Sequence, residues 1–286
     1  MAEEHIPEGA PEECGGSCSS CGVAGCGARS EDGPSKLEPN ARSSIKKAIA
    51  VVSGKGGVGK SLVTSLLASE FAKQGKRVAI LDADVTGPSI PKAFGVSARP
   101  IADEDGMNPI TTPSGIKVMS VNLLLPNEDT PVAWRGPVIT NALMQFWQDV
   151  NWGDIDIMLF DMPPGTSDVF LTIFQMLPID GIVTVSAPQE LVGSIVGKAV
   201  NLAHSLNVPV IGLVENMAYF KCDECGKQHH IFGEPKGALV AEKYEIPAVA
   251  TLPMDPSFAE LVDAGKIDRY DTEGALASIV EQIEKA

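Results

Sequence analysis

From Ser44 onward, short apolar runs rich in β-branched residues alternate with stretches in which apolar residues recur at helical spacing. The apolar runs show no polar alternation, which is typical of strands that are buried on both faces of a sheet. These predicted strands span residues 47–53, 77–82, 116–121, 155–160, 181–185 and 210–214. Helices are predicted near residues 61–74, 137–149, 188–206, 235–244 and 272–285. This order predicts an α/β fold, with a mostly parallel twisted sheet and helices on both of its faces.

The first 44 residues differ in composition from the rest of the chain. They are rich in Gly, Ser, Pro and Glu, contain four cysteines, and offer almost no bulky apolar side chains to a core. We therefore expect two parts, a flexible cysteine-containing N-terminal tail at residues 1–44 and one globular domain at residues 45–286. Within this domain, residues 134–137 and the Pro/Gly-rich piece 97–115 are expected to be loops at strand ends.

Charge and hydropathy restrict the binding partners and the cellular compartment that we expect for this chain. The net charge of −15 disfavours nonspecific binding to nucleic acid, which requires clustered Lys and Arg. No apolar run approaches the roughly 20 residues that a membrane-spanning helix needs. The acidic start from Met1 to Glu8 lacks the apolar core of a secretory signal. We expect a cytoplasmic protein, in which six cysteines indicate metal or redox chemistry more than structural disulfides.

A glycine-rich motif follows the first predicted strand and precedes the first predicted helix. It matches the phosphate-binding pattern G-x-x-x-x-G-K-S/T, and this context disfavours the alternative of a glycine-rich turn without a ligand. Its glycines let consecutive backbone N–H groups converge on phosphate oxygens. Lys60 is predicted to reach the β- and γ-phosphates, and the Ser61 hydroxyl to bind Mg²⁺. The predicted nucleotide-binding loop comprises Gly54, Lys55, Gly56, Gly57, Val58, Gly59, Lys60 and Ser61.

Lys55 is a second lysine near the start of this loop, and the general scheme does not require it. A lysine at this place resembles the deviant Walker A motif of a group of dimerising ATPases. The resemblance implies that Lys55 reaches the nucleotide bound by a partner subunit and acts there in catalysis.

Two aspartate clusters end predicted strands, where open α/β sheets bind their ligands. The first begins Asp82-Ala-Asp84, and the second is Asp161-Met-Pro-Pro-Gly-Thr166. We assign Asp161 to the Mg²⁺ shell, and Asp84 to orienting the attacking water in ATP hydrolysis. Asp82 is expected to shape the strand end. The alternative is that these aspartates only cap turns or helices.

A C-x-x-C pair, Cys222 and Cys225, follows the last predicted core strand. Two thiolates are half of a four-ligand metal or cluster site. The missing ligands could come from His229 and His230 as a zinc site, from the N-terminal cysteines, or from the same pair in a second subunit. The last option suits a two-fold dimer that holds a [4Fe–4S] cluster. A redox-active disulfide lacks the usual thioredoxin-like context.

The tail contains a second group of cysteines, separated by short glycine-rich spacers. Four thiols in such a short run can wrap one iron–sulfur cluster or one zinc ion, and the spacing favours a cluster over a zinc ribbon. The residues of this candidate N-terminal site are Cys14, Cys18, Cys21 and Cys26.

Together, the phosphate loop, the D-x-P-P-G-T motif and the late C-x-x-C resemble the Mrp-type ATPases of the MinD-like superfamily, across about residues 45–270. Further matches are Ala187-Pro-Gln189, Val214-Glu-Asn-Met217 and Leu252-Pro-Met-Asp-Pro256. The resemblance implies a P-loop NTPase that serves as an iron–sulfur cluster scaffold or carrier. It also implies that Asn216 helps to recognise adenine. The chain departs from many relatives at Leu62, which offers no hydroxyl to the α-phosphate.

The resulting hypothesis is a slow ATPase that uses ATP and Mg²⁺, assembles a [4Fe–4S] cluster between two copies, and transfers it to apo-proteins. The expected partners are a second copy, through the nucleotide and C-x-x-C faces, and apo iron–sulfur clients, with neither nucleic acid nor membrane. The alternatives are a MinD- or ParA-like positioning ATPase and a zinc-stabilised, nucleotide-dependent interaction protein. The first alternative needs a basic or membrane-binding face, and residues 278–286 carry little basic charge.

Overall fold

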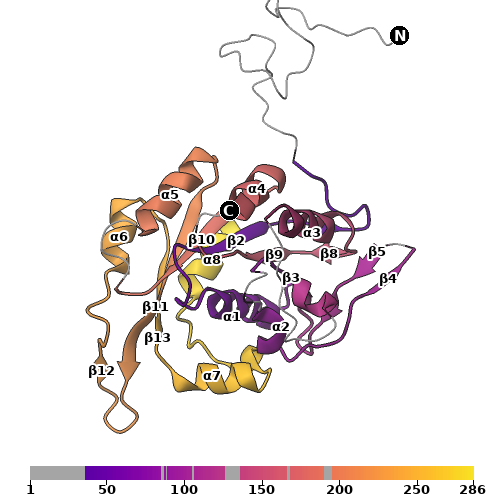
Figure 1. Ribbon diagram of the computed structural model, residues 1–286. Coiled ribbons are helices and arrows are strands. Elements are labelled where there is room, and N and C mark those ends of the chain that lie inside the picture. Colours follow the sequence, from indigo (N-terminus) through magenta and orange to yellow (C-terminus); the bar gives the residue numbers. More distant parts are fainter. Residues whose placement is uncertain are drawn as a thin grey trace, which may run out of the picture. The chain divides into compact units, whose positions relative to one another are not determined.

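The computed structural model describes residues 36–84, 87, 89–104, 106–125, 136–165, 168–189 and 195–286. Within these residues the apolar runs form one large sheet, whose strands β11, β10, β2, β9, β3 and β7 lie side by side in this order and run parallel (Figure 1). A further strand, β13, pairs in parallel with β11. The bounds are β2 (Ala48–Ser53), β3 (Val78–Asp82), β7 (Lys117–Ser120), β9 (Ile157–Asp161), β10 (Gly181–Ser186), β11 (Val210–Lys221) and β13 (Val249–Pro253). The prediction of an α/β fold with a mostly parallel sheet is confirmed.

Short strands extend the sheet or lie beside it. β6 (Ile110–Thr111) pairs antiparallel with β7, and β12 (Gln228–His229) pairs antiparallel with the far end of β11. Two further pairs are separate from the large sheet. They are β1 (Ser44–Ile45) with β8 (Asp154–Ile155), and β4 (Ile101–Asp103) with β5 (Gly106–Asn108).

The central strands bury side chains on both faces, because residues alternate in direction along a strand. In β2, Ala48, Ala50 and Val52 belong to one apolar cluster, whereas Ile49 and Val51 belong to the other. Helices α3 (Gly136–Gln148), α4 (Asp168–Met176) and α5 (Ile195–Ser205) contribute to the first cluster. Helices α1 (Lys60–Lys73), α2 (Ile90–Ala93), α7 (Pro256–Asp263) and α8 (Ala277–Lys285) contribute to the second. The strands therefore require helices on both faces.

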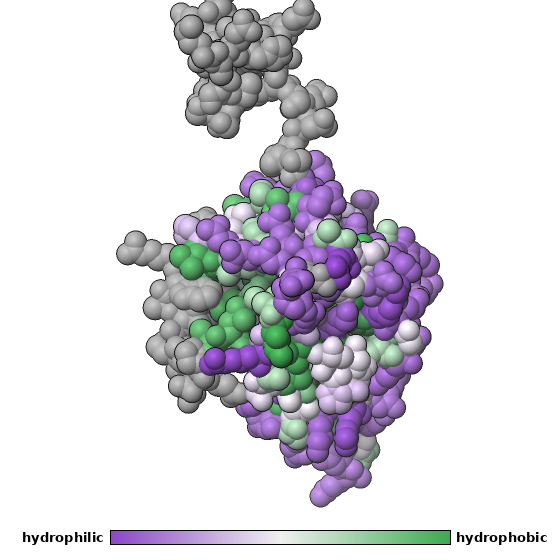
Figure 2. Space-filling view, turned by 90° about the vertical axis from the view of Figure 1, so that its right-hand side faces the viewer, coloured by the Kyte–Doolittle hydropathy of each residue, from purple (hydrophilic) through white to green (hydrophobic). Residues whose placement is uncertain are grey.

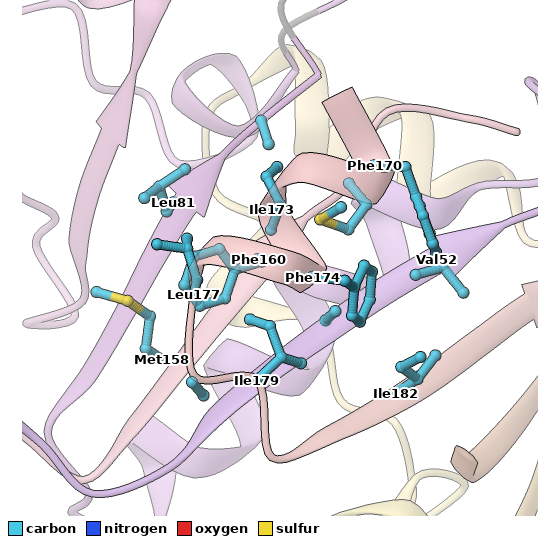
Figure 3. Close-up of a cluster of buried hydrophobic side chains, with 14 of the residues drawn as sticks. Val52, Leu81, Met158, Phe160, Phe170, Ile173, Phe174, Leu177, Ile179 and Ile182 are labelled. Carbon is cyan, nitrogen blue, oxygen red and sulfur yellow. The ribbon is translucent and has the colours of Figure 1, made fainter. Parts of the chain in front are cut away.

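Figure 3 shows the first cluster at α4. Phe170, Ile173 and Phe174 point from this helix toward the sheet, where Val52 and Ile182 lie. The rings of Phe170 and Phe174 are 4.5 Å apart between centroids. On the face that Figure 2 presents, hydrophilic residues cover most of the described surface. No described helix is long and apolar enough to cross a membrane.

Several elements differ from the prediction. α4 and α7 were not predicted, β4 to β6 lie in the expected loop 97–115, and α3 begins inside the expected loop 134–137. The helix predicted from residue 188 is a turn at residues 188–189, and α8 begins at Ala277, five residues after the predicted start at residue 272. β11 continues seven residues beyond Val214, because its far end pairs with β12. α6 (Gly237–Lys243) agrees with its prediction.

The described part of the predicted tail is bonded to the folded domain. The Leu37 N–H donates to the carbonyl of Met176 at 2.7 Å, and Trp147 Nε1 donates to the carbonyl of Leu37 at 2.8 Å. The compact unit accordingly spans Leu37–Ala286. Residues 1–35, with the cysteines of the predicted N-terminal site, lie outside the described residues.

Candidate functional site

The phosphate loop joins β2 to α1 and depends on two glycines with left-handed backbone. Gly57 has φ +86° and Gly59 has φ +84°, a region that side chains disfavour. Gly59 also caps α1, and no side chain caps this helix end. The first N–H groups of α1 therefore remain without a side-chain acceptor at the positive end of the helix dipole, which is the arrangement that binds phosphate.

A cavity of about 330 Å³ opens at this loop. Its lining consists of Ser53, Gly56, Gly57, Gly59, Lys60, Ser61, Leu62, Asp84, Gly87, Ser89, Ala93, Pro164 and Val262. The loop thus meets both aspartate-bearing segments and α7 around one space. Lys55 is exposed, whereas Lys60 is buried, so the two lysines of the motif occupy different environments.

Asp161 is fully buried and accepts from three side chains of α1. Lys60 Nζ lies 2.8 Å from Oδ1, Ser61 Oγ lies 2.5 Å from Oδ2, and Thr64 Oγ1 lies 2.9 Å from Oδ1. Lys60 Nζ also lies 3.5 Å from Asp84 Oδ2. The contact between Ser61 and Asp161 brings together a hydroxyl and a carboxylate, and oxygen donors of this kind fit Mg²⁺. A phosphate that enters the cavity would compete with Asp161 for Lys60.

Asp82 supports the neighbouring Asp84. Its carboxylate accepts the Asp84 N–H at 3.1 Å and the Ser120 hydroxyl at 3.0 Å. Burial raises the pKa of Asp82 well above its ordinary value, and the adjacent Asp161 carboxylate raises it further. Asp82 therefore fixes the strand end, while Asp84 lines the cavity.

Asn216 lies against the phosphate loop. Its Nδ2 donates to the carbonyl of Val58 at 2.9 Å, and a Cβ on Gly59 would stand 2.2 Å from Nδ2. Its side chain is buried, and its Oδ1 has no hydrogen-bond partner among the described residues. A buried acceptor without a donor is costly. This oxygen would be satisfied by a ligand group that donates a hydrogen bond.

The two described cysteines lie in a tight turn between β11 and β12, which projects from the body in Figure 1. The Gly226 N–H donates to the carbonyl of Cys222 at 2.8 Å, and Gly226 has φ +68°. The backbone N–H groups of Cys225 and Glu224 donate to the Cys222 sulfur and lower the pKa of this thiol below its ordinary value. Cys222 is half-buried and Cys225 is exposed. We call this turn, residues 222–227, the cysteine knuckle.

The knuckle does not assemble a complete metal site within the described part of one chain. There, no group of three or more His, Cys, Asp or Glu side chains is placed to hold a metal ion. His230 Nδ1 lies 3.0 Å from the carbonyl of Ala218, and Nε2 lies 3.5 Å from Glu234. The zinc site that would add His229 and His230 to the cysteines is therefore not formed. The structure does not describe Cys14, Cys18, Cys21 and Cys26.

Sequence reasoning missed two residues of this region. Thr64 lies one helical turn after Lys60, so the i to i+4 spacing could have placed it near Asp161. Glu215 is a charged residue at the end of a buried apolar run, and its carboxylate accepts the backbone N–H groups of Lys236 and Gly237. Its sequence position signals burial, but its partners lie more than 20 residues away and no local pattern identifies them.

Comparisons with known proteins show the family to which this chain is similar. Residues 44–286 match the family described as NUBPL iron-transfer P-loop NTPase, of the ParA group. The chain is 45% identical over 280 residues to an iron-sulfur cluster carrier protein of Clostridium perfringens, covering 93% of this chain and 98% of that protein. It is 49% identical over 224 residues to an iron-sulfur cluster carrier protein of Saccharolobus solfataricus, covering 78% of this chain and 76% of that protein.

Solved structures show the same fold. A nucleotide-binding protein of Archaeoglobus fulgidus in complex with ADP aligns with a TM-score of 0.73 and 44% identity, covering 79% of this chain and 89% of that chain. The cell division ATPase MinD of Pyrococcus furiosus aligns with a TM-score of 0.58 and 21% identity, covering 84% and 98%. The second likeness concerns the fold alone.

Proposed function

The chain belongs to the NUBPL iron-transfer P-loop NTPases, and from this premise we propose that it is an ATP-dependent iron–sulfur cluster carrier. It binds and slowly hydrolyses ATP, holds a [4Fe–4S] cluster as cargo between two copies, and passes the cluster to apo-proteins. The observation that carries this proposal is the presence, in one chain, of a phosphate loop with a buried Lys60–Asp161 pair and of a two-thiol knuckle. The similarity to iron-sulfur cluster carrier proteins and to an ADP-bound protein supports it.

At the nucleotide, Lys60 changes its partner and the other residues act where they lie. The backbone N–H groups of residues 54–61 cradle the phosphates, and Lys60 leaves Asp161 to contact the β- and γ-phosphates. Ser61 and Asp161, already in contact, would hold Mg²⁺, which neutralises phosphate charge when bound. Asp84, at the cavity wall, orients the attacking water. The Asn216 Oδ1 accepts from the exocyclic amino group of adenine, which supplies the donor that this buried oxygen lacks.

Lys55 is assigned a role in trans. A lysine that is exposed on the loop is placed to approach another molecule, whereas the buried Lys60 serves its own site. A cation from a second subunit would stabilise charge that develops on the phosphates during hydrolysis. Hydrolysis would then relax the segments 84–89 and 161–166 and change the geometry of the dimer.

The cargo site is built from two knuckles. One chain offers the thiols of Cys222 and Cys225, and a cluster held by four thiolates needs two more. A second copy related by a two-fold axis supplies the same pair. The lowered pKa of Cys222 favours the thiolate, which is the form that ligates iron.

The test is anaerobic reconstitution of the full chain with iron and sulfide, followed by iron and sulfide analysis, absorbance and EPR. Cys222→Ala and Cys225→Ala should each lose about two iron atoms per chain, half of a shared four-iron cluster. They should also lose cluster transfer to an apo-protein while nucleotide binding persists. Iron bound at the N-terminal cysteines would remain in both variants and serves as the internal control. Unchanged iron content in both variants would exclude the bridging site.

A further inference from the structure

Strand β11 connects the two functional regions, since it contacts the phosphate loop through Asn216 and leads directly into the cysteine knuckle. The chain that returns from the knuckle is held at three places, and all three are on β11. Gln228 and His229 pair with Lys221 and Phe220 in the ladder. The His230 ring bonds the Ala218 carbonyl, and the N–H groups of Lys236 and Gly237 bond the Glu215 carboxylate. In all three contacts the partner of the segment 222–237 is β11.

The Glu215 contact consists of two hydrogen bonds from one buried carboxylate. The side chain is completely buried, with Oε1 3.0 Å from the Lys236 N–H nitrogen and Oε2 2.8 Å from that of Gly237. A Cβ at residue 237 would stand 2.8 Å from Oε2, so glycine is needed for this approach. A buried carboxylate is costly unless hydrogen bonds satisfy it, which disfavours separation of the two segments.

Between its two ends β11 has a local irregularity. Met217 has φ +56°, a left-handed conformation that is uncommon for a residue with a side chain. The parallel register with β13 runs as far as Glu215 and resumes only at Tyr219. The kink therefore separates Glu215 and Asn216 from the part of β11 that carries the knuckle, and irregular strand positions of this kind redirect the chain that follows.

We propose that Glu215 is a positioning residue that couples the nucleotide site to the cysteine knuckle within one subunit. A nucleotide that engages Asn216 shifts this residue and the phosphate loop together, because Asn216 is bonded to Val58. The shift is transmitted along β11. Because Glu215 is bonded to residues 236 and 237, the segment 222–237 moves with the strand, and the solvent exposure of both thiols changes. The coupling rests on the proposed function, and it does not require a partner subunit.

The test measures the alkylation rates of Cys222 and Cys225 separately, by peptide mass spectrometry on the full chain with iodoacetamide. The rates are compared without nucleotide, with Mg-ADP and with Mg-ATP. In the wild type we expect nucleotide to change the rate at one or both thiols by about five-fold or more. In Glu215→Gln the new amide nitrogen faces a backbone N–H donor, so one hydrogen bond is lost. In this variant and in Gly237→Ala, the ratio of the alkylation rates with and without nucleotide should fall to near one. Nucleotide affinity should stay within about two-fold of the wild type.

Glu242→Gln is the matched control, since this exposed carboxylate lies on the adjacent helix α6. It should keep the wild-type ratio. The coupling is overturned if the wild type shows no nucleotide effect, if both variants keep the effect, or if both lose nucleotide affinity. If Glu215→Gln fails to fold, Gly237→Ala tests the coupling instead, because this variant keeps the Glu215 carboxylate. Failure of iron loading in the wild type would count against the carrier function alone, because the thiol readout needs no cluster.

Discussion

The two lysines of the phosphate loop differ in burial, and their substitutions should therefore differ in effect. Lys60 is buried against Asp161, whereas Lys55 is exposed. Lys60→Ala should abolish detectable ATP binding, because it removes the cation that meets the β- and γ-phosphates. Lys55→Ala should keep nucleotide affinity within about three-fold and lose turnover by about two to three orders of magnitude. Titration with a fluorescent ATP analogue and phosphate-release kinetics measure the two effects, and normal hydrolysis by Lys55→Ala would refute the role in trans.

Asn216 should determine the preference for the base. Its buried Oδ1 lacks a donor, which the amino group of adenine supplies and the carbonyl of guanine does not. Asn216→Ala should lower the preference for ATP over GTP by about ten-fold, which corresponds to one hydrogen bond that is left unmade. Competition binding with the two nucleotides checks this. Asn122→Ala provides a control at another asparagine, which lies in the short 3-10 turn Val121–Leu124 after β7. An unchanged ATP/GTP ratio in Asn216→Ala would contradict the assignment.

The pKa of Cys222 predicts how the knuckle responds to pH. The N–H groups of Cys225 and Glu224 lower it, so the thiolate persists to a lower pH in the folded chain than in the unfolded chain. This contribution to stability is complete above the unfolded pKa and is lost as the pH falls through the folded pKa. The midpoint of Cys222 alkylation against pH should therefore be lower in native protein than in the same protein in urea. Equal midpoints would show that the turn does not stabilise the thiolate.

Among the elements, the central strands were predictable and the peripheral ones were not. Runs such as 47–53 and 155–160 are apolar without alternation because both faces are buried, and this signal is local. α4 (Asp168–Met176) does carry a helical signal, since its buried residues 169, 170, 173 and 174 recur at helical spacing, but it is short and follows two prolines. The extension of β11 to Lys221 depends on pairing with β12, a contact made only after the chain has turned back at the knuckle.

The start of α1 is the most constrained helix end in the site. Gly59 and Gly75 flank this helix and both have left-handed backbone, but only Gly59 has a neighbour in the way, Asn216 Nδ2 at 2.2 Å. Gly75→Ala should lower the free energy of unfolding by about 1 kcal/mol from backbone strain alone. Gly59→Ala should cost about 3 kcal/mol, since Asn216 must also move and lose its bond to Val58. Urea unfolding of both variants measures the difference, and equal losses would contradict it.

For the molecule as a whole, the sequence predicted which motifs form the site, but not the hydrogen bonds that connect these motifs. The phosphate loop, Asp84 and Pro164 of the Asp161 motif line one cavity, and Asp161 contacts Lys60 of the loop, because parallel strands end at the same edge of the sheet. Their meeting therefore follows from motif and fold class. The bond from Asn216 to Val58 and those from Glu215 to residues 236 and 237 join segments that are distant in sequence. Only the folded arrangement identifies them.

The half-complete cargo site predicts the assembly state. Within the described residues one chain presents two thiols and no cluster of three or more His, Cys, Asp or Glu ligands, so cluster loading should itself promote dimerisation. Sedimentation of the reconstituted chain should show a dimer, and iron removal by a chelator should return monomers when no nucleotide is present. ATP should add a second contribution through Lys55, so Lys55→Ala should dimerise with cluster and no longer with ATP alone.

The control for this prediction is the double variant Cys222→Ala/Cys225→Ala, which should dimerise with ATP and no longer with cluster. Mixing it with wild-type chains separates a shared site from two independent ones. A bridging cluster needs both knuckles, so the mixed dimer should carry no bridging iron, and the iron bound per wild-type chain should fall as the variant is added in the presence of ATP. If each wild-type chain keeps its full iron content in the mixture, one knuckle holds its cargo without the other, and the shared site must be abandoned.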